Sequence, residues 1–534
     1  MKSDCLSFSA IPHSSRLFLD YLHDFSKVSQ FYPRVPNPRQ WLAEQAAELR
    51  YDDQRRERVA AVLERQNRGF GGSQKTLESI ARLRSGAATV VTGQQVVLFG
   101  GPLFSILKAV SAVRVAAEAS RSGVDAVPVF WLATEDHDLA EVNHTLIPDQ
   151  DGQPRLLIAA SRGVPGAPMS DIRLGAEIEP LVAEAAELLG ETEVSQFLRE
   201  SYRPDETFGT AFARLFARLF QDLGVILLDA SDPELHVVAG PVMRAAVVGA
   251  QEIDEALLQR GAALRNHGYH EQVKVTPLST LLFRKQNGTR VVIHRGNGGF
   301  TAGKEKFSEQ ELLQRITASP QDFSPNVLLR PVVQDYLLPT LAYVGGPAEV
   351  AYFAQAGVVY QEILGRMTPV LPRFSATLVD SRTQRLLAKY RLSLPDLFAG
   401  PEPTSELLAT RNLPGDLQAQ FDQAGASVTA AMNDIRASLE RLDPTLVEAA
   451  GRAASKMSYQ LRRLRSRTAR AELRRSEEVG RHADALSAAL YPNKGLQERE
   501  ICGLYFVARE GRQLLPNLVA SAQSGCPDHQ IIYL

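Results

Sequence analysis

Alternating apolar and polar stretches predict a strand–helix–strand unit over residues 89–144. A β-branched run opens it, and a glycine-rich turn at residues 92–101 follows. Pro102 then begins a long stretch with apolar residues at helical spacing. A second apolar run, at residues 126–132, stops abruptly at the polar residues 134–138. Polar residues therefore follow both predicted strands, at the edge where open α/β sheets bind their ligands.

The same pattern predicts an α/β core that extends well beyond this unit. Residues 224–229 form an apolar run that ends in aspartate, which is typical of a parallel strand buried on both faces. We expect the core to span residues 86–380, with insertions at about 146–222 and 266–325. Residues 1–85 carry apolar positions at helical spacing and are predicted to pack on the core as a helical region.

The pattern changes over residues 381–490. Apolar residues step by four and three through 417–442 and again through 446–471, with Asp443-Pro444 between the two runs. Heptad-like spacing on two helices joined at a proline predicts an antiparallel coiled-coil hairpin. Residues 491–534 regain a globular pattern and are expected to return to the core. The predicted fold class is therefore α/β, a parallel-sheet core with insertions, plus an α-helical coiled-coil domain.

Composition and charge describe an ordinary globular protein of several structural units. The chain has 534 residues, 44% hydrophobic and 22% charged, and a net charge of -2, so no global field draws it to nucleic acid or to anionic lipid. Residues 462–475 are rich in arginine, but Glu472, Glu477 and Glu478 are interleaved with and follow them, which favours a solvated coiled-coil face over a nucleic-acid site.

The chain has three cysteines, Cys5, Cys502 and Cys526. Their number and spacing do not indicate a disulfide framework, and no CxxC pair suggests a zinc site. A reducing compartment is therefore expected. The N-terminal residues lack the apolar segment of a signal peptide, and no run approaches the roughly 18 apolar residues of a membrane span. These features predict a soluble, cytoplasmic protein with no membrane partner.

The turn after the first strand offers a candidate anion site. Backbone amides at a glycine-rich turn before a helix bind phosphate or carboxylate groups. The candidate substrate-binding residues there are Thr92, Gly93, Gln94, Gln95 and Gly101. A tight strand-to-helix connection explains the same glycines without a ligand. Lys108, early in the predicted helix, is a candidate for nucleotide binding, with a solvated lysine as the alternative.

Three acids and an imidazole follow the second strand and form the clearest cluster of candidate site residues. Glu135 and Asp138 are candidates to bind a substrate ammonium group, and such acids also suit Mg²⁺. His137 is the candidate general base because an imidazole titrates near pH 6.5, and Asp136 and His144 are further catalytic candidates. The two histidines stand seven positions apart, which is not helical metal spacing, so no metal site is predicted. Helix capping explains one or two of the acids but not the whole set.

Two later turns add candidates. Residues 345–347 form a second Gly-Gly-Pro loop, so Glu349 is expected to line the other wall of one cleft, unless this loop is only a structural turn. Residues 491–499 form a polar turn that is either a linker or a nucleotide site. Its candidate nucleotide-binding residues are Asn493, Gly495, Gln497 and Arg499.

Four segments taken together resemble the BshC family of bacillithiol biosynthesis. They read TGQQVVLFGGPLFSILKA at 92–109, PVFWLATEDHDLAEVNH at 128–144, GGPAEVAYFAQ at 345–355 and YPNKGLQER at 491–499. The resemblance runs over nearly the whole chain and keeps the order of its parts. It implies a Rossmann-like core related to class I nucleotidyltransferases and a coiled-coil domain through which two copies form a homodimer.

The resemblance also implies a ligase that joins the carboxylate of L-cysteine to the amine of glucosaminyl-malate, the last step of bacillithiol biosynthesis. A carboxylate is a poor acyl donor at neutral pH, so activation through an acyl-adenylate or an acyl-phosphate is expected, with ATP/ADP and Mg²⁺ as the cofactors. The partners are then small molecules, and no nucleic acid is expected. By residue type alone, Arg284, Arg295 and Arg330 are candidates to pair with malate. The alternative function is a non-catalytic, nucleotide-binding coiled-coil scaffold.

Overall fold

The computed structural model describes residues 1–160, 163–296, 298–475, 477–522 and 525–534. The chain divides into two compact units. Unit 1 comprises residues 1–150, 154–377 and 498–532, and unit 2 comprises residues 151–153, 378–497 and 533–534.

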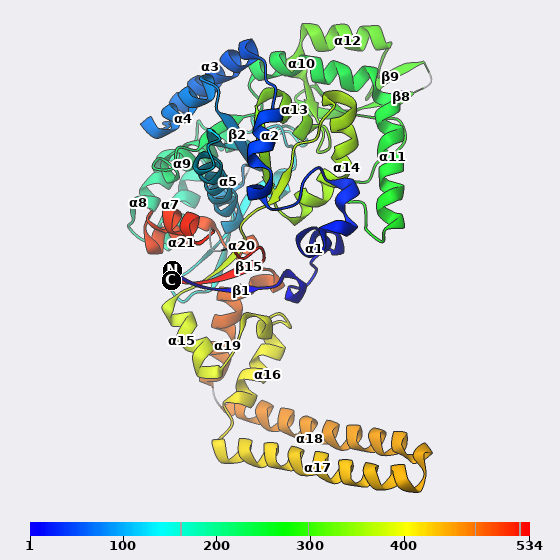
Figure 1. Ribbon diagram of the computed structural model, residues 1–534. Coiled ribbons are helices and arrows are strands. Elements are labelled where there is room, and N and C mark those ends of the chain that lie inside the picture. Colours follow the sequence, from blue (N-terminus) through cyan, green and yellow to red (C-terminus); the bar gives the residue numbers. More distant parts are fainter. Residues whose placement is uncertain (161–162, 297, 476, 523–524) are drawn as a thin grey trace. The chain divides into compact units, whose positions relative to one another are not determined.

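A five-stranded parallel sheet forms the centre of unit 1 (Figure 1), with the order β13–β12–β2–β3–β6. Its strands are β2 (Ala88–Gln94), β3 (Ala126–Leu132), β6 (Ile226–Asp229), β12 (Thr340–Gly345) and β13 (Val370–Pro372). The chain starts in the middle at β2, adds β3 and β6 on one side, and then β12 and β13 on the other. This is the strand order of a Rossmann-like sheet, and the direction of addition reverses between β2 and β12.

Both faces of the sheet are covered. Every residue of β3 and of β12 is buried, and successive side chains of a strand point to opposite faces. Helix α5 (Leu103–Arg121) packs against β2 and β3, and its outer side meets α21 (Gly503–Glu510) and α22 (Leu514–Ser521). The apolar residues at helical spacing after Pro102 predicted this helix, and most of α5 is buried because the C-terminal helices return to cover it.

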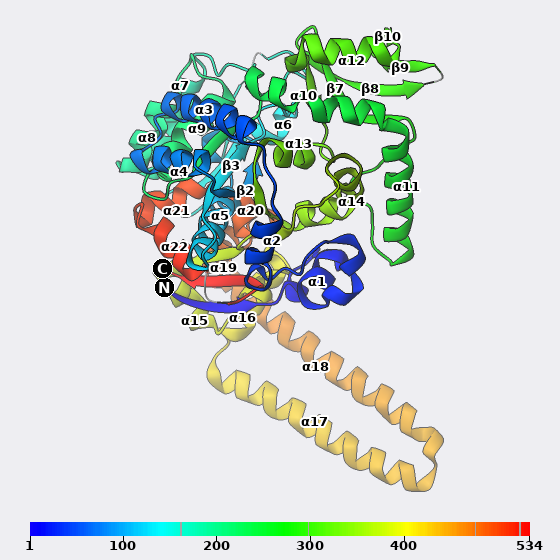
Figure 2. The ribbon, with the colours of Figure 1, turned by 45° about the horizontal axis from the view of Figure 1, so that its top comes forward.

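Helices and small sheets surround this core (Figure 2). The N-terminal helices are α1 (Arg16–His23), α2 (Leu42–Glu48), α3 (Asp53–Gly69) and α4 (Gln74–Arg84). The first insertion contains α6 (Leu139–Val142), β4 (His144–Pro148), β5 (Pro154–Ile158), α7 (Ile178–Leu189), α8 (Glu193–Ser201) and α9 (Phe208–Leu219). The later helices are α10 (Pro233–Val248), α11 (Ala250–Asn266), α12 (Glu309–Ala318), α13 (Arg330–Leu337), α14 (Pro347–Leu364) and α20 (Gln497–Glu500).

The second insertion forms a separate five-stranded sheet with the order β10–β9–β8–β7–β11, antiparallel throughout. Its strands are β7 (Ser279–Gln286), β8 (Thr289–Gly296), β9 (Gly299–Ala302), β10 (Glu305–Phe307) and β11 (Phe323–Pro325). Asn287 and Gly288 make the two-residue turn between β7 and β8, both with positive φ, as a tight hairpin requires.

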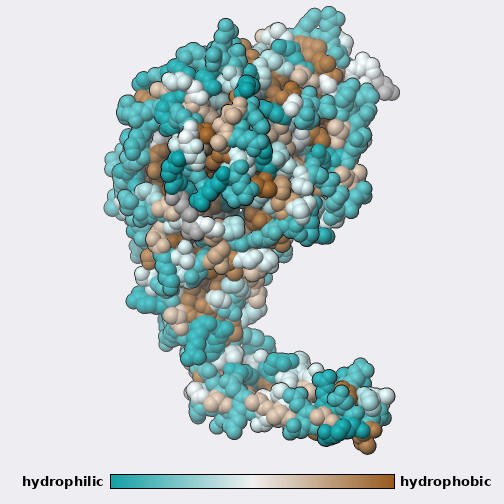
Figure 3. All heavy atoms as spheres, viewed as in Figure 1, coloured by the Kyte–Doolittle hydropathy of each residue, from teal (hydrophilic) through white to brown (hydrophobic). Residues whose placement is uncertain are grey.

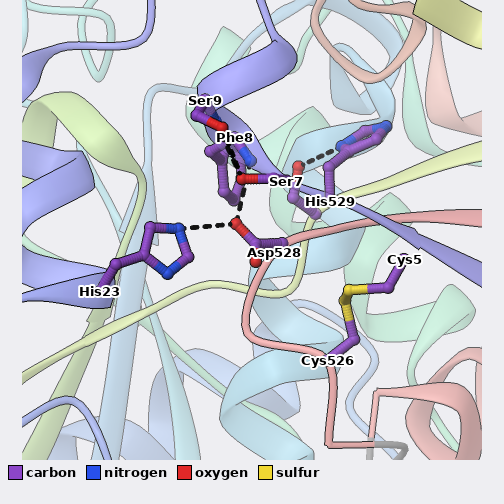
Figure 4. Close-up of a disulfide and its surroundings, with 9 residues drawn as sticks. Cys5, Ser7, Phe8, Ser9, His23, Cys526, Asp528 and His529 are labelled. Atoms are coloured by element: carbon purple, nitrogen blue, oxygen red, sulfur yellow. Dashed lines mark hydrogen bonds and ion pairs between the residues drawn. A yellow bond between two sulfur atoms is a disulfide. The ribbon is translucent and has the colours of Figure 1, made fainter.

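The two ends of the chain meet in a third sheet, with the order β1–β15–β14. Its strands are β1 (Lys2–Leu6), β14 (Ala376–Val379) and β15 (His529–Tyr533). Cys5 and Cys526 form a disulfide beside this sheet, with their Cα atoms 6.0 Å apart (Figure 4). The expectation of unpaired cysteines is thus wrong for these two, because strand pairing joins residues 521 positions apart. Cys502 is a buried thiol.

Unit 2 is helical. It contains α15 (Ser381–Tyr390), α16 (Pro401–Arg411), α17 (Gly415–Leu442), α18 (Val447–Arg475) and α19 (Glu477–Leu490). Helices α17 and α18 form an antiparallel hairpin with its turn at Asp443-Pro444, and an ion pair of 2.9 Å joins Asp422 to Arg465 across it. Figure 3 shows apolar surface at the turn end, where Leu442 and Leu446 are exposed. Across the described part of the chain, none of the helices has the length and apolar character to cross a bilayer.

Candidate functional site

A cavity of about 730 Å³ lies in unit 1, at the carboxyl ends of β2, β3 and β12. This is the switch point of the parallel sheet, where the loops after neighbouring strands diverge and leave a crevice. Ten of the residues predicted from the sequence line it: Gly93, Gln94, Gln95, Lys108, Glu135, Asp136, His137, Arg330, Glu349 and Arg499.

Gly93 is required where β2 passes β3. A Cβ atom at this position would lie 2.9 Å from the carbonyl oxygen of Trp131, closer than real Cβ contacts come. The glycine therefore lets the two strands approach closely at the mouth of the cavity.

Lys108 holds the two glycine-rich loops together. Its buried ammonium group donates to the Gly93 carbonyl (2.7 Å) and to Gln94 Oε1 (2.8 Å), and it lies 2.5 Å from Glu349 Oε2. An ammonium group has three protons, and these three partners use them. Lys108 thus links β2 to α14 and fixes Gln94 and Glu349 in the cavity wall.

The Glu349 carboxylate also has all its hydrogen-bond partners within the protein. Its carboxylate accepts from Tyr343 Oη (2.5 Å) and from the Gly346 amide (2.7 Å), besides its contact with Lys108. Burial opposes ionisation, but the lysine charge and these donors keep the pKa of the Glu349 carboxyl below its ordinary value. Burial also raises the pKa of Tyr343, which stays a phenol that can donate.

Three arginines form what we call the cationic side of the cavity: Arg330, Arg373 and Arg499. Arg330 donates to Tyr352 Oη (2.7 Å), and Arg373 makes a bidentate ion pair with the buried Glu498 (2.6 and 2.9 Å). Burial lowers the pKa of Arg499, although a guanidinium remains charged in any case. Guanidinium groups suit planar or tetrahedral oxyanions such as carboxylates and phosphates.

Three carboxylates form the acidic side: Glu135, Asp136 and Glu141. They follow β3, whereas Arg373 follows β13, on the other side of β2. Gln95 Nε2 donates to Asp136 Oδ2 (2.7 Å) and to Glu141 Oε2 (2.5 Å) and so holds two of the acids together. One cavity therefore presents anions on one side and cations on the other.

His137 lies on the acidic side and is partly exposed. Its Nδ1 atom accepts from the Arg290 guanidinium (3.2 Å), since arginine has no acceptor, so the neutral ring carries its proton on Nε2. Burial and the Arg290 charge lower the pKa of His137, which favours the neutral imidazole. Arg290 itself is fixed by Ser324 Oγ (3.0 Å) and by the Pro325 carbonyl (3.0 Å).

Several predicted residues lie outside the cavity lining. Thr92 is buried and donates to the Val344 carbonyl (2.8 Å), and Gly101 makes a turn with a φ of 73°. His144 and Asp138 are exposed, at the start of β4 and before α6.

The residues of the 491–499 turn fall in different units of the structure. Asn493, Gly495 and Gln497 belong to unit 2, whereas Arg499 lines the cavity of unit 1. Gln497 is buried and bonds to both backbone groups of Leu378, which is a structural task. Of the three arginines proposed for malate, Arg330 lines the cavity, whereas Arg284 pairs with Glu305 and Arg295 with Asp254.

Sequence reasoning missed four groups that shape the site: Arg290, Tyr343, Arg373 and His236. Arg373 directly follows β13, so the rule that strand ends carry ligand-binding residues could have identified it. Arg290 comes from the hairpin of the second sheet, and His236 from α10, and neither has a local sequence signal. Among the described residues, no group of three or more His, Cys, Asp or Glu side chains is arranged to hold a metal ion.

The fold and the cavity define a Rossmann-like α/β protein with a polar cavity at its switch point and an added coiled-coil unit. Two family models match the chain: the N-terminal Rossmann-like domain of "Bacillithiol biosynthesis BshC" over residues 1–374, and its C-terminal coiled-coil domain over residues 376–534. The chain belongs to the BshC family.

Similar proteins span the whole chain. A protein of Koribacter versatilis is 50% identical over 532 residues, covering 100% of both chains, and one of Solibacter usitatus is 37% identical, again over 100% of both. A protein of Salinibacter ruber is 33% identical over 97% of this chain and 96% of its own. All three carry the name "Putative cysteine ligase BshC".

Proposed function

We propose that this protein is a ligase of bacillithiol biosynthesis that joins the carboxylate of L-cysteine to the amine of glucosaminyl-malate. The observation that carries the proposal is the cavity with an acidic and a cationic side at the switch point, in a chain of the BshC family. The names of its relatives support the choice of cysteine.

The two sides suit the charges of the substrates. Cysteine brings an ammonium group, which the acidic side attracts, and malate brings carboxylates, which fit the guanidinium groups of the cationic side. Lys108 and Glu349 neutralise each other, and Glu498 neutralises Arg373, so Arg330 and Arg499 are the groups that select an anion.

The reaction forms a C–N bond at the cysteine carboxyl carbon and breaks one of its C–O bonds, and the amine nitrogen gives up a proton. ATP would be held through its phosphates by the guanidinium groups of the cationic side, and it would supply the phosphoryl or adenylyl group on which the departing oxygen leaves. Mg²⁺ commonly binds through one or two carboxylates together with nucleotide phosphates, so Asp136 and Glu141 are the residues suited to it.

His137 is the candidate group for the proton of the acceptor amine. As arranged, its Nδ1 atom is occupied by Arg290 and Nε2 carries the proton, so His137 accepts a proton only when the Arg290 contact opens. His137→Gln should therefore lower kcat by roughly 10²–10⁴-fold, the usual contribution of a general base. His144→Gln is the matched control, because His144 is exposed and outside the lining; equal losses in both variants would remove His137 from the chemistry.

The test of the function itself is a ligation assay. Purified protein with cysteine, glucosaminyl-malate, ATP and Mg²⁺ should yield the amide, detected by mass spectrometry, and omission of either substrate should abolish it. Absence of product with every nucleotide and divalent metal tried would contradict the proposal.

The coiled-coil hairpin is the proposed dimer interface. Six large apolar side chains on α17, α18 and their turn are at least 40% exposed: Ile435, Leu442, Leu446, Met457, Tyr459 and Leu464. A second copy of the hairpin would cover them, because exposed apolar residues along a helical seam are the usual contacts of coiled-coil association.

A further inference from the structure

A buried histidine stands behind the acidic side of the cavity. His236 lies on α10 with 5% of its surface exposed. Its Nδ1 atom is 2.9 Å from the Phe323 carbonyl oxygen and 3.3 Å from that of Pro320, and its Nε2 atom is 3.2 Å from Glu135 Oε1. Both ring nitrogens therefore face oxygen acceptors, and one of these acceptors belongs to a residue of the cavity.

This geometry limits the protonation of the ring. A carbonyl oxygen only accepts, so Nδ1 must carry a proton, and Nε2 must carry another if Glu135 is ionised. The Arg290 guanidinium, from the second sheet, places a further positive charge near Glu135. Burial opposes the charge on the ring, but the carboxylate and the two carbonyls hold the pKa of His236 above its ordinary value. These contacts favour a charged ring that donates from both nitrogens, one of them to Glu135.

We propose that His236 is a positioning residue that holds the Glu135 carboxylate directed into the cavity, where Glu135 binds the ammonium group of the amino-acid substrate. The inference rests on the proposed function, because it assigns one substrate group to one residue of that site. Among the three acids, Glu135 is singled out because Gln95 holds the other two to each other, whereas a charged partner fixes Glu135.

Each substrate carries an amine, and the reaction requires the two amines to be in opposite protonation states. The amine of the acceptor must lose a proton before it attacks, whereas the amine of cysteine must stay protonated, because a free amine would compete as a nucleophile. The buried ring of His236 fixes the position of the Glu135 carboxylate in the cavity wall, 3.2 Å away. Glu135 is therefore assigned to the cysteine ammonium, and the proton of the acceptor amine is left to His137.

The test compares His236→Leu, His236→Gln and Glu135→Gln with wild type in the ligation assay. His236→Leu and Glu135→Gln should raise KM for cysteine by roughly 10- to 100-fold, the usual worth of a hydrogen bond to a charged group, with a much smaller change in kcat and in KM for glucosaminyl-malate. His236→Gln retains a donor toward Glu135 and should recover part of the loss.

The chain offers a matched control. His23 also pairs with a carboxylate, Asp528, at 3.1 Å, but it lies near the terminal sheet (Figure 4) and outside the cavity lining. His23→Leu should leave both KM values at the wild-type level. A second readout is the preference in kcat/KM for cysteine over 3-sulfanylpropionate, which lacks the ammonium group; it should fall in His236→Leu and Glu135→Gln alone.

The outcomes separate the two proposals. If wild type makes the amide and both variants keep the wild-type KM for cysteine, the role of His236 and Glu135 is overturned and the function stands. Equal loss for both substrates in His236→Leu and in Glu135→Gln would also overturn it, because general damage to the site would then explain the result. If wild type makes no amide, the proposed function fails first.

Discussion

The ion pair between Arg373 and Glu498 is the most strongly buried charge pair at the cavity, and its removal has a calculable cost. The side chains are 4% and 1% exposed, and the guanidinium makes two contacts with the carboxylate, of 2.6 and 2.9 Å. Ser375 Oγ (2.8 Å) and the Ala376 amide (3.0 Å) donate to the same carboxylate. Every neighbour of Glu498 is thus arranged for its ionised form.

Two estimates of the cost agree. Burial opposes the charge, but the guanidinium and its fellow donors lower the pKa of Glu498 from an ordinary 4.5 to about 2. At roughly 1.4 kcal/mol for each pH unit, this interval corresponds to a stabilisation near 3 kcal/mol. Independently, removal of one partner of a buried ion pair typically costs about 3–5 kcal/mol, since it leaves the other charge buried without compensation.

Glu498→Gln should therefore lower the free energy of unfolding of unit 1 by about 3 kcal/mol, and Arg373→Met by a similar amount. The double variant Arg373→Met/Glu498→Leu should recover most of this loss, because neither charge remains. Urea unfolding followed by tryptophan fluorescence reports on unit 1 alone, since both tryptophans, Trp41 and Trp131, lie in it.

The control is Glu191→Gln, which breaks an exposed pair with Arg199 and should cost less than about 1 kcal/mol. The pair also has a pH signature. Because the pKa of Glu498 is depressed in the folded state, its stabilisation is present above about pH 4.5 and is lost as the pH falls toward about 2. Wild type should lose stability faster than Glu498→Gln across this window. Parallel pH curves, or a double variant no better than either single one, would refute the reasoning.

Three further predictions address other parts of the molecule. Gly93→Ala should raise KM and lower stability, since the added Cβ meets the Trp131 backbone at 2.9 Å; unchanged kinetics in the ligation assay would show that the loop adapts. Reduction of the Cys5–Cys526 disulfide, or Cys526→Ser, should lower the free energy of unfolding of unit 1 by about 2–4 kcal/mol. Urea unfolding with and without reductant measures this loss, and identical midpoints would contradict the prediction. Leu442→Glu should convert the proposed dimer to monomers in analytical ultracentrifugation, and a monomeric wild type would contradict the interface.

Local patterns in the sequence were sufficient for the strands at the centre of the sheet. The apolar runs at 89–91, 126–132 and 224–229 correspond to β2, β3 and β6, because buried parallel strands need continuous apolar residues. The same logic predicts ligand-binding residues at strand ends, and Gly93, Glu135 and His137 do line the cavity. The two helices of the coiled coil followed from their heptad-like spacing.

Contacts between distant segments could not be predicted this way. Cys5 and Cys526 had no local signal, since their pairing depends on β1 lying beside β15. Lys108 was identified as a residue that could reach an anion, but its three protons are used by Gly93, Gln94 and Glu349, a fact set by the approach of two loops.

By itself, the sequence determined the local elements, the position of the polar residues at the strand ends, and the resemblance to one family. The tertiary structure decided which of those residues share a cavity and what each can do there. His137 shows the difference: its identity suggested a base, but Arg290, 153 positions away, occupies its accepting nitrogen. A side chain's chemistry depends on its neighbours, and neighbours from other strands and helices are fixed only when the whole chain has folded.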